Sequence, residues 1–128
     1  MNPLTREWIE KAEGDFATAS RELRARKSPN YDAVCFHAQQ CAERYLKALL
    51  QEANSPFGKT HNLVGLLDLL LPTDPSWETM HSDLQRLSSF AVYVRYPGAS
   101  ADKTLARESL DVCRVVRAKA RSSFGLLL

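Results

Sequence analysis

The stretch YDAVCFHAQQCAERYLKALLQEA at residues 31–53 decides the fold of this chain. With about 100° between successive residues, as in an α-helix, most of its apolar side chains fall on one broad arc. The arc comprises Val34, Cys35, Ala38, Cys41, Ala42, Tyr45, Leu46 and Leu49. Because so wide an arc must be covered by more than one neighbour, the pattern predicts a deeply buried central helix.

The opposite side of this predicted helix carries Gln40, Glu43 and Lys47, with the aromatic Phe36 among them. Glu43 and Lys47 are four residues apart in the order that favours an ion pair on an exposed helix. A polar stripe of this kind is typical of a solvated face. The aromatic side chain within it indicates instead a face that meets something else, such as a second subunit. The sequence leaves both interpretations open.

The rest of the chain also has helical spacing, interrupted by four breaks. The breaks are SPNYD at 28–32, NSPFGK at 54–59, LPTDPS at 71–76 and YPGAS at 96–100. Between them three apolar stripes step by three and four residues: Trp8, Ala12, Phe16, Ala19 and Leu23; Leu63, Leu66, Leu67 and Leu70; and Trp77, Met80, Leu84, Leu87 and Phe90. Asp32 and Ser76 are candidate N-caps. We predict an all-α, antiparallel up-and-down bundle of four to five helices, with residues 1–128 forming a single domain.

Composition and motif spacing argue against several classes of protein. The 128 residues carry 17 Lys and Arg against 15 Asp and Glu, so a nucleic-acid surface would have to come from charge placement. No segment has the apolar length of a membrane span or the apolar core of a signal peptide, which favours a cytoplasmic protein with no membrane partner. Cys35, Cys41 and Cys113 have no C-x-x-C spacing and are predicted to be buried thiols. The three histidines lack metal-ligand spacing, so we expect neither a metal nor a cofactor.

The last predicted helix, over about residues 101–124, has two distinct faces. Its core side carries Leu105, Val112, Val116, Ala120 and Phe124, and a separate narrow stripe carries Lys103, Arg107, Arg114, Arg117 and Arg121. Five cations in one row repel one another. The stripe is therefore either a plain solvated face or a surface for an anion such as RNA, a nucleotide or an acidic partner.

A second candidate for anion binding is the turn VYVRYPGAS at 92–100. Pro97 and Gly98 account for the end of the preceding helix, but they do not account for the charge of Arg95. His61, in the segment KTHNL, precedes the third predicted helix. Its simplest role is to tie this loop to a neighbouring helix, and a role in a site is the alternative.

Four motifs, in order and spacing, resemble the HEPN domain family, a helical module found beside minimal nucleotidyltransferases. The first is Trp8, Ala12 and Asp15, and the second is the Q-Q-x-x-E-x-x-x-K-A-L pattern of Gln39, Gln40, Glu43, Lys47, Ala48 and Leu49. The third is THNL at 60–63, and the fourth is Arg95-Tyr96-Pro97. The resemblance covers nearly the whole chain and implies a four- or five-helix bundle that commonly dimerises.

The resemblance also implies a choice of functions, because family members act as RNA-processing toxins or as non-catalytic partners of nucleotidyltransferases. Ribonuclease members carry Arg-x4-6-His near the start of a late helix, where the arginine stabilises phosphate and the histidine transfers a proton. Here Arg95 is present, but the candidate histidine positions hold Ser100, Ala101 and Asp102. This departure puts ribonuclease activity in doubt and leaves Arg95 as a phosphate ligand.

Three hypotheses follow. The favoured one is a non-catalytic nucleotide- or RNA-binding module that partners a separately encoded nucleotidyltransferase, in a toxin–antitoxin pair in one version, with Arg95, Tyr96, Arg107 and Arg114 as phosphate-binding residues. The second is a ribonuclease toxin in which His61 or His37 supplies the acid/base group. The third is a purely structural homodimer. Its interface would include Phe36, Gln40, Glu43 and Lys47, with His61 as a further candidate.

Overall fold

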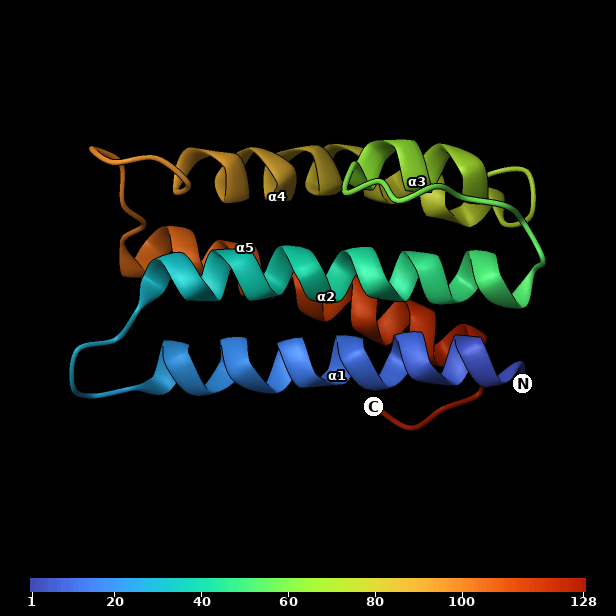
Figure 1. The fold of residues 1–128 in the computed structure, drawn as a ribbon, viewed down its shortest axis with the longest axis horizontal. Coiled ribbons are helices and arrows are strands. Elements are labelled where there is room, and N and C mark those ends of the chain that lie inside the picture. The colour runs from blue at the N-terminus through green and yellow to red at the C-terminus, as the bar shows by residue number, and fades with distance from the viewer.

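The computed structural model describes residues 1–128 and contains five α-helices, one 3-10 helix and no strand. The elements are α1 (Pro3–Arg24), α2 (Tyr31–Glu52), α3 (Leu63–Leu70), the 3-10 helix η1 (Pro75–Met80), α4 (His81–Tyr93) and α5 (Lys103–Ser123). Figure 1 shows α2 between α1 on one side and α3 with α4 on the other, with α5 behind it. The prediction of an all-α bundle of four to five helices is confirmed.

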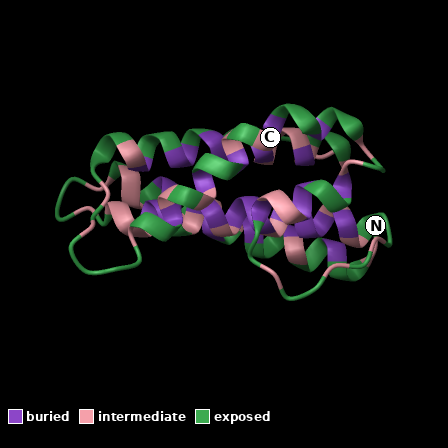
Figure 2. Ribbon diagram, turned by 90° about the horizontal axis from the view of Figure 1, so that it is seen from above, coloured by how far each residue is buried: buried purple, intermediate pink, exposed green.

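The central position of α2 explains its sequence. It packs against α1, α3, α4 and α5, and its predicted apolar arc is fully buried except for the half-buried Leu49. Burial of a helix on so many sides needs small residues as well as large ones, which accounts for its alanines and cysteines. All three cysteines of the chain are buried and free. Figure 2 shows that buried positions gather where the helices face one another, whereas the connections at both ends are mostly exposed or intermediate.

Two predicted N-caps are wrong by two residues. The side chain of Asn30 caps α2 by accepting a hydrogen bond from the Ala33 amide, and Asp32 lies in the first turn. Asp32 Oδ1 instead accepts a hydrogen bond of 2.7 Å from the Ala101 amide, so it ties the start of α2 to the connection that precedes α5. Asp74 rather than Ser76 caps η1, because the turn begins one residue before Pro75.

The predicted breaks coincide with the ends of the helices. α4 ends at Tyr93, and the chain turns through Gly98, whose φ of 92° lies in the left-handed region that glycine adopts without strain. None of the helices combines the length and the apolar character that a membrane span requires. Figure 1 shows that the α1–α2 and α4–α5 connections lie at the same end of the bundle, and this end holds the candidate site.

Candidate functional site

A basic cleft of about 680 Å³ lies where the end of α1, the α1–α2 connection and the first half of α5 meet. Its cations are Arg24, Arg26, Lys103, Arg107 and Arg114. Asp111 is its one carboxylate, and it pairs with Arg114 at 3.3 Å. Five cations against one carboxylate produce a positive potential in a concave surface, which attracts anions.

Most of the cations in the basic cleft are free to bind a ligand. Arg24, Arg26, Lys103 and Arg107 make no side-chain hydrogen bond or ion pair with the rest of the chain, and all four are exposed. The backbone beneath them is held in place, because the Glu22 carboxylate accepts a hydrogen bond from the Asn30 amide across the α1–α2 connection. A fixed backbone with unpaired guanidinium groups suits phosphate, which arginine binds through two parallel hydrogen bonds.

Two of the predicted phosphate-binding residues, Arg107 and Arg114, line this cleft. The other two, Arg95 and Tyr96, lie outside it in the turn after α4, at the same end of the bundle (Figure 1). The Arg95 guanidinium is exposed and has no partner in the chain, and Tyr96 is 67% exposed. The structure thus separates the predicted residues into a cleft and a neighbouring turn.

The expected row of five cations on α5 is divided between two environments, so the prediction that all five face solvent or an anion is wrong. Arg117 and Arg121 have side chains that are only 16% exposed, and both face Glu13 of α1. Arg117 donates two hydrogen bonds to that carboxylate, at 2.8 and 2.7 Å, and lies over the Phe16 ring. These two arginines hold α5 against α1 and are unavailable to an anionic ligand.

The hydroxyl group of Tyr45 on α2 also donates a hydrogen bond to the Glu13 carboxylate. Glu13, Arg117, Arg121 and Tyr45 thus form one cluster, the Glu13 cluster. Burial raises the pKa of Glu13, but the hydrogen bonds from Arg117 and Tyr45 and the nearby charges outweigh burial and leave that pKa below its usual value. Burial raises the pKa of Tyr45 well above its usual value, and the hydrogen bond to Glu13 raises it further. The cluster is therefore an ionised carboxylate that joins three helices.

Glu43 and Lys47 are buried, at 3% and 5% exposure, and do not form a solvated stripe. Lys47 Nζ lies 3.0 Å from Glu43 Oε2 and above the Trp8 ring of α1. His61 also contacts the pair, with its Nδ1 3.0 Å from Glu43 Oε1. This contact ties the loop before α3 to α2, which is the simplest role expected of His61.

No imidazole of this chain lies beside Arg95. His61 contacts Glu43, which lies about 16 Å along α2 from Asp32, the residue tied to the α4–α5 connection. His81 begins α4, so it lies about 20 Å from the turn that ends this helix. His37 binds Asp15 of α1 at 2.8 Å, on the opposite side of α2 from α4 (Figure 1). Within one chain, the structure therefore places no histidine where it could act with Arg95 on the same phosphate. His37 instead shares Asp15 with Arg44, which pairs with the other carboxylate oxygen at 2.7 Å.

The remaining predicted interface residues lie on the open side of α2. Phe36 is 47% exposed and packs edge-on against His37, and Gln40 is half-buried. Next to them Arg44 pairs with Asp15 at 2.7 Å. This side of α2 keeps one exposed aromatic ring, as the sequence indicated, but its charged residues are paired within the chain.

Arg24 and Arg26 were missed in the sequence analysis. The signal for them was present in the run RELRARK at 21–27, which places four cations at the end of the first helix. The segment precedes a break at the same end of the bundle as residues 101–107, because α1 and α5 each have one end there. A basic run at a helix end, near the basic half of another helix, indicates a shared surface.

The fold and the cleft define the class of protein: a small antiparallel helical bundle with a basic cleft at one end. The family model of the HEPN domain matches residues 5–122, and the chain therefore belongs to the HEPN domain family. A crystal structure of an archaeal HEPN homologue has the same fold, with a TM-score of 0.67 and 24% sequence identity, covering 93% of this chain and 96% of that chain. No protein with curated annotation matches.

Proposed function

We propose that this HEPN module is non-catalytic and binds the phosphates of a nucleotide or RNA in its basic cleft. The observation that carries the proposal is the placement of five cations and one carboxylate in a single concavity. Four of these cations have no partner in the chain, so their charge is available to a ligand. Phosphate contacts made by such groups supply most of the sequence-independent affinity for nucleic acids.

Arg95 and Tyr96 offer a second contact for the ligand, outside the basic cleft. Both are exposed in the turn after α4, at the same end of the bundle as the cleft. A tyrosine ring can stack on a base while a neighbouring guanidinium binds the adjoining phosphate. The lack of a histidine near Arg95 supports binding over cleavage. The family also supports a partner, and we propose that the module acts with a separately encoded minimal nucleotidyltransferase, in the manner of a toxin–antitoxin pair.

Fluorescence anisotropy with single-stranded RNA and with mononucleotides tests the binding function. The double variant Arg24→Gln/Arg107→Gln should weaken RNA binding at least about ten-fold and reduce the slope of log affinity against log salt by about 1.4, or 0.7 for each lost phosphate contact. The control variant Arg6→Gln/Lys11→Gln loses the same charge from exposed positions near the start of α1 and should change neither value appreciably. Equal losses in both variants, or no binding by the wild-type protein alone or with its partner, would contradict the proposal.

The ribonuclease alternative requires a different experiment. Prolonged incubation of the pure protein with tRNA and mRNA should leave the RNA intact. Cleavage that is abolished by Arg95→Gln or by His61→Ala would reverse the assignment. Cleavage that survives these two substitutions and His37→Ala as well would indicate a contaminating nuclease.

A further inference from the structure

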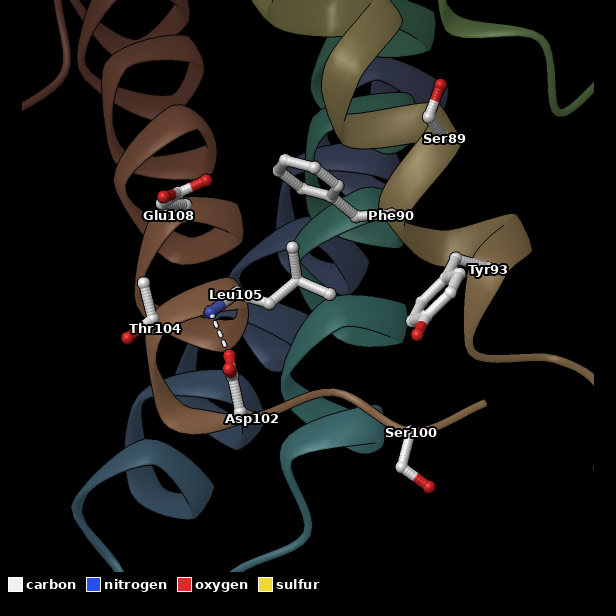
Figure 3. A pocket seen from close by; sticks show the side chains of 8 residues that line it. All are labelled: Ser89, Phe90, Tyr93, Ser100, Asp102, Thr104, Leu105 and Glu108. Carbon is white, nitrogen blue, oxygen red and sulfur yellow. Dashed lines mark hydrogen bonds between the residues drawn. The ribbon is translucent and has the colours of Figure 1, made fainter. Parts of the chain in front are cut away.

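A groove of about 590 Å³ between the last turns of α4 and the first turns of α5 has a chemistry opposite to that of the basic cleft. Its floor consists of Phe90, Tyr93 and Leu105, and Figure 3 shows Phe90 and Leu105 between the two helices. Asp102 lies at the start of α5, and Glu108 lies on α5 beyond Leu105. Three hydroxyl side chains complete the lining, which contains no lysine or arginine.

The two carboxylates of the groove keep acceptor capacity for a ligand. Asp102 uses Oδ1 to cap α5 through the Leu105 amide at 2.8 Å, and its other oxygen has no partner in the chain. Glu108 is exposed and forms no hydrogen bond or ion pair. The first half of α5 thus turns Lys103 and Arg107 into the basic cleft and Glu108 into this groove.

The groove has features that suit an organic cation rather than a metal ion. Its floor is apolar and provides no further carboxylate, and the volume far exceeds that of an inorganic cation. Tyr93 is 55% exposed, so its ring can lie against an alkyl stem or a guanidinium. Carboxylate oxygens at the rim then accept charge-assisted hydrogen bonds from the cationic end of the stem.

We propose that this groove is the docking site for an arginine or lysine side chain of a protein partner, with the apolar stem on Phe90, Tyr93 and Leu105 and the cation at Glu108 and Asp102. Charge complementarity favours this occupant, because the lining of the groove carries two carboxylates, Asp102 and Glu108, and no cation. The inference rests on the proposed function only in that a protein partner exists. It concerns a surface separate from the basic cleft.

Nuclear magnetic resonance titration of the ¹⁵N-labelled 128-residue chain tests this site, with capped Gly-Arg-Gly as the probe. We expect saturable shifts confined to residues around 89–108, and binding about five-fold weaker in Glu108→Gln. The control Glu10→Gln removes an equally exposed and unpaired carboxylate from α1 and should bind the probe as the wild type does. Capped Gly-Leu-Gly should give no saturable shifts, because it supplies the stem without the charge.

Three results would overturn the inference: no saturable shifts, equal binding of the leucine peptide, or equal binding by Glu108→Gln. A further result against it is a homodimer, seen by light scattering, that both Arg95→Gln and Glu108→Gln dissociate, since the occupant would then be Arg95 of a second copy. RNA binding is measured separately, so RNA binding without peptide binding would refute only this inference. Peptide binding without RNA binding would refute only the proposed RNA function.

Discussion

Replacing Glu13 by Gln should lower the free energy of unfolding by about 2 kcal/mol. The carboxylate accepts two hydrogen bonds from Arg117 and one from Tyr45, and it lies 3.5 Å from a guanidinium nitrogen of Arg121. Hydrogen bonds to a charged group contribute about 1.5–3 kcal/mol. Since the Glu13 side chain is 32% exposed, solvent screens part of this, and the estimate stays near the lower end of that range.

The pH dependence of the same variant gives a second, independent check. The pKa of Glu13 is lowered in the folded protein, so its contribution to stability is fully present above its unfolded pKa, about 4.3. That contribution is lost as the pH falls through the lower pKa of the folded state. The stability difference between the wild-type protein and Glu13→Gln should therefore be constant above about pH 5 and shrink below about pH 4.

Urea denaturation followed by circular dichroism measures the difference directly. In thermal melts 2 kcal/mol corresponds to about 7 °C for a chain of this length. Glu10→Gln, on an exposed position of the same helix, is the control and should change stability by less than about 0.5 kcal/mol. A loss below 0.5 kcal/mol in Glu13→Gln, or a difference that grows as the pH falls, would refute the account of the cluster as an ionised link between three helices.

Three further substitutions probe other contacts. Glu43→Ala should destabilise the fold by about 3 kcal/mol in urea denaturation, because it leaves the buried Lys47 without its partner, and a cost near zero would show that the pair contributes little. Asp32→Ala should cost about 1 kcal/mol and speed hydrogen exchange of the Ala101 amide, whereas unchanged exchange would show that this hydrogen bond does not hold the α4–α5 connection. Phe36→Glu should leave monomer stability within about 0.5 kcal/mol but reduce any dimer seen by light scattering, and an unaffected dimer would exclude Phe36 from the interface.

The fold could be predicted from the sequence because the features that decide it are local. The apolar arc of residues 34–49 specifies a helix covered on several sides, and the proline- and glycine-containing breaks mark where helices end. A bundle is what short connections between such helices produce. The N-cap predictions failed by two residues for a local reason as well, since Asn30 and Asp32 are both good capping residues and only the backbone conformation decides between them.

The environments of charged residues could not be predicted in the same way, because they depend on contacts distant in sequence. Glu43 and Lys47 have the spacing of an exposed pair, but both are buried, and they contact Trp8 and His61 from other segments of the chain. The arginine stripe on α5 is divided by Glu13, more than one hundred residues earlier in the chain. Periodicity places a residue on a face of a helix, but another element decides what covers that face.

The division of charge on α5 has a consequence for how the module can work. The second half of the helix uses its arginines to hold α1, so cations remain free only in the first half, beside the α1–α2 connection. On the other side of that same half, Glu108 faces the α4–α5 groove.

The two surfaces are close together and opposite in sign, so an anionic ligand in the basic cleft and a cationic side chain in the groove attract each other through α5. Binding of RNA and of a basic protein partner should therefore be mutually favourable, by the same factor in both directions, because the coupling between two binding equilibria is reciprocal. Affinity for the arginine probe measured with and without saturating RNA tests this, and a lower affinity in the presence of RNA would show that the two surfaces compete.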